Sequence, residues 1–103
     1  MHIEINAERS IQCDAALSLR VDELVRSRLA PFADRVIRVD AGLSDWCADI
    51  ETDNVGKRCV LQAQLAGHEP VIADDTGETI EQATNNASKA MLEQLQHLAS
   101  RKG

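Results

Sequence analysis

The stretch that decides the fold is Lys57-Arg58-Cys59-Val60-Leu61-Gln62-Ala63-Gln64-Leu65. Small or apolar side chains occupy every second position from Cys59 to Leu65 and alternate with a largely polar set. This period of two predicts a half-buried β-strand. The same alternation over 3–5 and 37–43 predicts two earlier strands. Val71 and Ala73 indicate a short fourth one, and Pro70 favours an edge position because proline has no N–H to donate.

Two other segments have the period of an amphipathic helix. Asp14 stands where an N-cap belongs, and Pro31 predicts that the helix after it ends or kinks nearby. The apolar stripe of this first helix is Leu17, Val21, Leu24, Val25, Leu29 and Phe32. A second helix is expected to begin after Thr79, because Gln82 lies three residues later in capping-box spacing. Its stripe is mostly small: Ile80, Ala83, Ala87, Ala90, Met91 and Leu98.

The predicted order is β-α-β-β-β-α in one domain over residues 1–103. Both helices need the same apolar sheet face, which predicts an α+β, two-layer sandwich with a four-stranded mixed sheet and both helices on one face. A helical crossover makes the first two strands parallel, and the remaining pairs are expected to be antiparallel. Residues 45–56 lack periodicity, so they form either a long loop or the tip of an extended hairpin.

Composition narrows the class of protein. No apolar run approaches the roughly 20 residues that cross a bilayer, and the start has no signal-peptide pattern, so a cytoplasmic protein without a membrane partner is expected. The net charge is −6, and Trp46 and Phe32 are the only aromatic residues. Both facts disfavour a generic binder of single-stranded nucleic acid. However, five acids and no base lie between residues 39 and 56, so a basic surface elsewhere remains open.

Signatures of catalysis are missing from the sequence. The three histidines lie far apart, and no glycine-rich phosphate loop occurs. Asp74 and Asp75 are adjacent in a strand and therefore point to opposite faces. We predict no enzyme activity, no catalytic residues, no metal and no cofactor. The cysteines form no C-x-x-C pair and are expected to be buried or half-buried structural thiols: Cys13, Cys47 and Cys59.

Two features leave alternatives open. The arginines are either solvated surface charges, as Asp22 and Arg26 at i,i+4 spacing indicate, or part of a binding surface. Trp46 is either an exposed anchor for a partner or a cap that folds back onto the sheet.

Several runs in fixed order carry a family resemblance. They are FADRVIRV at 32–39, LSD at 43–45, KRCVLQAQLAG at 57–67 with Pro70 after it, and a long final helix from Thr79 to Leu98. Together they resemble the ribosome hibernation-promoting factor and ribosome-associated inhibitor A family, in its short, single-domain form. The resemblance covers nearly the whole chain.

This resemblance implies a bacterial, non-enzymatic regulator of translation. It would bind rRNA of the small ribosomal subunit in the channel for mRNA and tRNA, and stabilise idle ribosomes under stress and in stationary phase. Basic side chains would contact rRNA phosphates. The residues that the resemblance assigns to this role are Arg20, Arg26, Arg28, Arg35, Arg38, Lys57, Arg58, Lys89, Arg101 and Lys102.

The chain also departs from the family pattern. Before its tail, the last helix has Lys89 as its only base, and polar residues are expected on its surface at Thr84, Asn85, Asn86, Ser88, Gln94 and Gln96. Fewer phosphate contacts predict weaker ribosome binding. The alternative is a divergent member that has lost its RNA surface and acts as a protein-interaction module or homodimer. Its contacts would be the loop around Trp46 or the exposed edge of the first or fourth strand.

Overall fold

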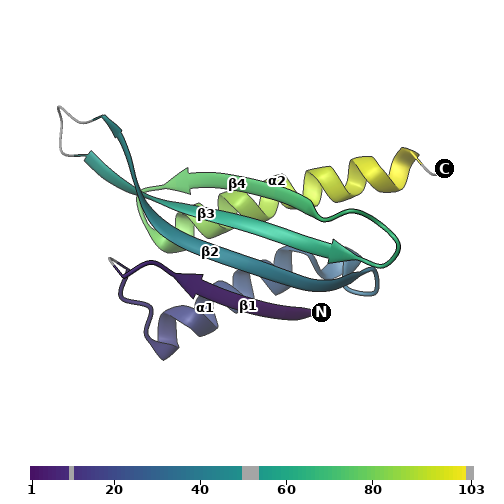
Figure 1. Cartoon of the computed structure of the whole chain (residues 1–103), viewed down its shortest axis with the longest axis horizontal. Coiled ribbons are helices and arrows are strands. Elements are labelled where there is room, and N and C mark those ends of the chain that lie inside the picture. The colour runs from purple at the N-terminus through teal and green to yellow at the C-terminus, as the bar shows by residue number, and fades with distance from the viewer. Residues whose placement is uncertain (10, 50–53, 102–103) are drawn as a thin grey trace.

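A computed structural model describes residues 1–9, 11–49 and 54–101 of the chain. Figure 1 shows four strands and two helices in the predicted order. They are β1 (His2–Ala7), α1 (Ala15–Arg28), β2 (Val36–Asp49), β3 (Asn54–Leu65), β4 (Val71–Gly77) and α2 (Ile80–Arg101), with a short 3-10 helix, η1 (Ala30–Phe32), after α1. No helix in this part of the chain is long and apolar enough to span a membrane.

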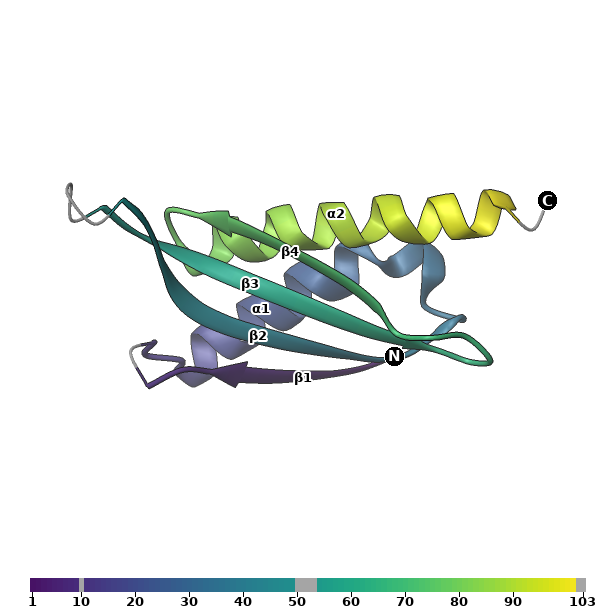
Figure 2. The same ribbon diagram turned by 45° about the horizontal axis from the view of Figure 1, so that its top comes forward.

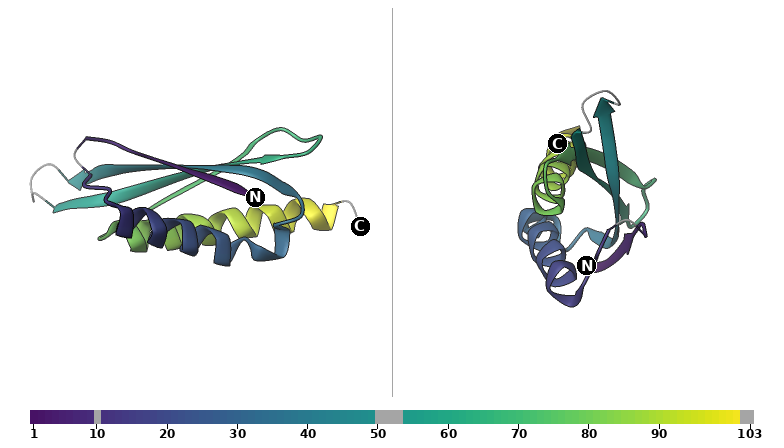
Figure 3. Two further views of the ribbon diagram at one scale, coloured as in Figure 1. Left: turned by 90° about the horizontal axis from the view of Figure 1, so that it is seen from below. Right: turned by 90° about the vertical axis from the view of Figure 1, so that its left-hand side faces the viewer.

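The sheet has the strand order β1-β2-β3-β4. The β1 strand runs parallel to β2, and the other two pairs are antiparallel. Both helices cover the same face of the sheet (Figure 3). The α+β class, the mixed sheet, the strand directions and the edge position of β4 are thus confirmed.

The predicted signals begin and end both helices. The Asp14 side chain accepts a hydrogen bond from the Leu17 N–H at 2.8 Å, which caps α1. The α1 helix ends at Arg28, and Pro31 lies in η1. At the start of α2, the Gln82 N–H donates to the Thr79 hydroxyl at 3.0 Å. These caps satisfy N–H groups that have no partner inside the helix.

The core lies between the sheet and the two helices. Its fully buried members include Leu29, Leu43, Leu61 and Met91. The α2 helix packs on β3, β4 and α1, so it buries a wider arc than a single apolar stripe. Thr84 and Ser88 lie within this arc and are completely buried, which corrects the expectation that they face solvent. Their small side chains let the helix approach its neighbours closely.

The segment between the second and third strands is an extended hairpin, and the alternative of a long loop over 45–56 was wrong. The β2 strand continues to Asp49 and β3 begins at Asn54. Figure 2 shows this hairpin reaching past the starts of both helices. A register shift between Cys47 and Asp49 interrupts the regular pairing of the two strands near this end.

Candidate nucleic-acid interface

The basic residues assigned to rRNA binding do not form one continuous surface. The outer side of the helices holds Arg20, Arg28 and Lys89. The open face of the sheet holds Arg38 and Arg58. The margins between these two surfaces hold Arg26, Arg35 and Lys57. Arg101 is the last residue of α2, and Lys102 lies outside the described residues.

Carboxylates neutralise both arginines on the open face of the sheet. Arg38 pairs with Glu4 on β1 and with Asp40 at 2.9 Å. The hydrogen bond that Arg38 donates to Asp40, together with the negative charge of Asp40, raises the pKa of Arg38. Arg58 pairs with Asp74, which lies diagonally across from it on β4. A phosphate approaching this face must displace these carboxylates, and the acids would repel it.

The cations at the margins are mostly occupied as well. Lys57 pairs with Asp45 across the hairpin. Arg26 donates to Asp22 and to the Met1 carbonyl, each at 3.0 Å, and the hydrogen bond to Asp22 raises the pKa of Arg26. The expected i,i+4 pair therefore forms. Arg35 lies over the Phe32 ring, 6.0 Å from its centroid, and has no carboxylate partner among the described residues.

The outer side of the helices offers a different arrangement. On α2, Glu81, Asn85 and Lys89 follow one another at spacings of four and therefore lie in one row. This row lies beside Arg20 and Arg28 of α1, because α1 packs on α2. A groove of about 440 Å³ lies between them. Arg20 pairs with Glu81 at 3.3 Å and with Glu23 at 3.8 Å, whereas Arg28 donates to the amide oxygen of Asn85 at 2.8 Å. The groove thus has an acidic and a basic end.

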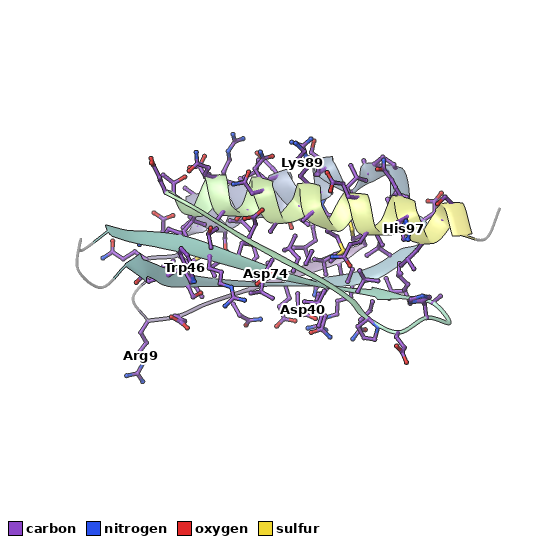
Figure 4. All side chains as sticks on the ribbon, turned by 90° about the horizontal axis from the view of Figure 1, so that it is seen from above. Arg9, Asp40, Trp46, Asp74, Lys89 and His97 are labelled. Atoms are coloured by element: carbon purple, nitrogen blue, oxygen red, sulfur yellow. The ribbon has the colours of Figure 1, made fainter. Side chains whose placement is uncertain are left out.

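Lys89 does not line this groove but lies beside it, on the same helix as Asn85. It follows Asn85 by one helical turn, is exposed, and has no ion pair within the described residues. Figure 4 shows it on the side of α2 that faces away from the sheet, remote from Asp40 and Asp74. We call Arg28, Asn85 and Lys89 the groove cluster. Two cations and an amide suit contacts to phosphate and sugar hydroxyl oxygens.

Sequence reasoning missed Asn85 as a member of this cluster. It assigned the cations one by one, with no means of knowing which would meet a carboxylate. The i,i+4 spacing of Asn85 and Lys89 was a usable signal. The sequence contains no signal for the contact between Arg28 and Asn85, since 57 residues separate these two residues in the chain.

The structure describes the side chains of two of the three cysteines, Cys13 and Cys59. Burial raises the pKa of the Cys59 thiol to about 11, and contact with Thr84 offsets this only in part. Cys13 is half-buried, and the side chain of Cys47 lies outside the described residues. Across the described ranges, no group of three or more His, Cys, Asp or Glu side chains is placed to hold a metal ion.

Comparison with known proteins yields no matching family model and no matching curated sequence. Solved structures do match. A ribosomal subunit interface protein from Coxiella burnetii superposes with a TM-score of 0.77 at 14% identity, covering 97% of this chain and 99% of that one. The chain has the ribosomal subunit interface protein fold.

A second solved structure agrees with this result. The N-terminal domain of Protein Y from Thermus thermophilus matches with a TM-score of 0.73 at 18% identity, over 95% of this chain and 99% of that domain. The resemblance inferred from the sequence is therefore confirmed for the fold. At such low identity, shared architecture does not transfer function residue by residue.

Proposed function

We propose that this single-domain, non-enzymatic protein binds the ribosome and inhibits translation on idle particles in the bacterial cytoplasm under stress. The observation that carries the proposal is the end-to-end match to a ribosomal subunit interface protein. It covers 97% of this chain, which supports a common overall shape. The site would be the small-subunit rRNA in the path of mRNA and tRNA.

Within this function we assign rRNA contact to the helical side, centred on the groove cluster. Arg28 and Lys89 are free of carboxylates, so a phosphate can approach them without breaking an ion pair. Arg20 lies at the other end of the groove and would release Glu81 to take part. Arg38 and Arg58 on the open face are proposed to be bystanders, because their charges are already compensated.

Salt dependence distinguishes this small site from a broad one. Each neutralised phosphate contributes about −0.7 to −0.9 to the slope of log K against log salt. Three contacts, from Arg20, Arg28 and Lys89, predict a slope of about −2 to −3. Engagement of all ten assigned cations would give about −7 to −9.

The experiment is co-sedimentation with purified ribosomes at low and physiological salt, with mRNA and initiator tRNA as competitors. The double variant Arg28→Glu, Lys89→Glu is expected to abolish pelleting. Arg9→Glu is the matched control, because Arg9 is exposed, carries the same charge and lies far from Lys89 (Figure 4). Pelleting of the double variant at wild-type level would overturn the site. No pelleting of the wild-type protein even at low salt would overturn the function.

A second candidate function is a protein-interaction module that has lost its RNA surface. The observation that favours it is the neutralisation of Arg20, Arg26, Arg38, Lys57 and Arg58 by carboxylates, in a chain of net charge −6. Trp46 would contribute, since it is 41% exposed on the open face of the hairpin. Heparin retains a protein only where a basic surface is free, so retention separates the two candidates.

A further inference from the structure

The two edges of the sheet differ in how their backbone groups are satisfied. At the β4 edge, side chains of α2 cover the strand: Gln94 donates to the Ile72 carbonyl at 2.9 Å and Asn86 to the Thr76 carbonyl at 3.0 Å. The Thr76 N–H donates to the side chain of Asp75 at 2.8 Å. These contacts occupy three of the backbone groups that would otherwise pair with another strand, so this edge is partly covered.

The β1 edge has no such cover. The Glu8 N–H donates to the Leu43 carbonyl of β2, and backbone directions alternate along a strand. The N–H and C=O groups of Ile3, Ile5 and Ala7 must therefore point away from β2. None of them has a hydrogen-bond partner among the described residues. The Met1 carbonyl, which lies just before the strand, accepts a hydrogen bond from Arg26 at 3.0 Å.

An open groove of mixed polarity accompanies this edge. It lies between β1 and α1 with a volume of about 770 Å³, and Ile3, Ile5, Ala15 and Leu19 line it together with polar residues. Leu19 is 61% exposed, the most exposed large apolar side chain in the described part of the chain. An unpaired strand edge accepts an added strand through its backbone groups, and exposed apolar side chains beside it, such as Leu19, add burial to that pairing.

We propose that β1 pairs antiparallel with β1 of a second copy of this chain, around a twofold axis at Ile5. In this register Ile5 faces Ile5 of the second copy, and Ile3 faces Ala7. Every outward N–H and C=O group of the three residues then gains a partner. The two sheets join into one continuous sheet of eight strands, and the groove beside Leu19 becomes covered.

Charge selects this register over its neighbours. Glu4 faces Asn6 of the second copy, and His2 faces Glu8, so no like charges are opposed. A slip that keeps the same side chains on the core face must move by two residues. One such slip sets Glu4 against Glu4, and the other sets Glu4 against Glu8. Like charges directly opposite each other destabilise strand pairing.

The occupant is thus identified by self-complementarity of His2–Ala7 together with Glu8. This inference is independent of the proposed rRNA contacts, because it uses neither the groove cluster nor a ribosome. The β1 pairing can be disproved while ribosome binding is confirmed, and ribosome binding can be disproved while the β1 pairing is confirmed.

The test is sedimentation equilibrium of the purified chain over a range of concentrations, with three variants. Ala7→Pro removes an outward N–H that β2 does not use, and Leu19→Glu places a charge in the groove. Each is expected to raise the dimer dissociation constant at least about tenfold. Ile72→Glu is the matched control, because Ile72 is 58% exposed but lies at the other edge, and it should leave the constant unchanged.

Circular dichroism verifies that each variant folds. Amide hydrogen exchange gives a readout by residue: at high concentration Ile3, Ile5 and Ala7 should become protected in the wild-type chain. A chain that stays monomeric up to about 1 mM would overturn the proposal. So would a dimer that Ile72→Glu disrupts and that folded Ala7→Pro and Leu19→Glu leave intact.

Discussion

The two faces of the sheet are built from the same strands and are held by different forces. On the covered face, Leu43 of β2 and Cys59 of β3 are opposed and buried beneath the helices. On the open face, Ser44 is opposed to Arg58, and Arg38 and Arg58 meet carboxylates on adjacent strands. Apolar burial stabilises the first face, and exposed ion pairs contribute little to the second.

This difference separates stability from binding. Arg38 and Arg58 on the open face are already paired with carboxylates. Removing these exposed ion pairs should therefore change the free energy of unfolding little. The outer side of the helices, in contrast, retains cations without carboxylate partners at Arg28 and Lys89. Arg28 and Lys89 therefore lie on the opposite side of the molecule from Arg38 and Arg58, although the family resemblance assigns all four to one role.

The largest predicted effect concerns the covered face. Leu61 is completely buried, so Leu61→Ala should lower the free energy of unfolding by about 2–5 kcal/mol, through lost burial and the remaining cavity. Ile72→Ala, on the open side of the next strand, should change it by less than about 0.5 kcal/mol. Urea denaturation of both variants measures the contrast. Equal losses would mean that the two faces do not differ as described.

A pH effect should follow from the buried thiol. The pKa of Cys59 rises from 9.0 to about 11 on folding. The folded state thus holds its proton more tightly, and stability should fall as pH rises from 9 to 11, by up to about 2–3 kcal/mol. Denaturation of the wild-type protein and of the Cys59→Ala variant at several pH values isolates the contribution of Cys59 to the pH dependence of stability. A variant with the same pH slope as the wild type would contradict the prediction.

Next in size is the cap of the helix that covers β1 and β2. Asp14→Ala removes the acceptor for the Leu17 N–H and should lower the free energy of unfolding by about 0.5–2 kcal/mol. Asp14→Asn retains an acceptor and should recover most of the loss. Thermal melts of the two variants give the comparison, and equal destabilisation would exclude a capping role.

The smallest effect is expected on the open face. A double-mutant cycle of Arg58→Ala and Asp74→Ala should give a coupling energy of about 0.2–1 kcal/mol, because both side chains are nearly half exposed. Added salt should reduce it further. Coupling well above this range would show that the open face stabilises the fold, and would break the contrast between the faces.

Sequence patterns predicted most of the fold correctly, because their signals are local. Asp14, Pro31 and Thr79 fix where helices begin and end through contacts within one turn. The prediction that Thr84 and Ser88 face solvent was wrong. A polar side chain on a helix normally indicates a solvent-exposed position, but here both the sheet and α1 pack against α2. The sequence does not separate a hairpin from a loop over 45–56, because apolar and polar residues do not alternate regularly there.

The candidate site was less predictable for a related reason. Each cation could be named from the sequence, but its partner lies on another element: Glu81 for Arg20, Asn85 for Arg28 and Asp74 for Arg58. Distances in space between such residues depend on how strands and helices pack.

The sequence by itself determined the element order, the helix caps, the parallel first pair and the core face of each strand. Hydrophobic period and capping chemistry act within a few residues, so they can be read directly. Only the tertiary structure decided which cations are neutralised, that α2 buries two hydroxyl residues, and that one sheet edge is partly covered while the other is open. Those properties arise from residues distant in the chain, and packing alone brings them together.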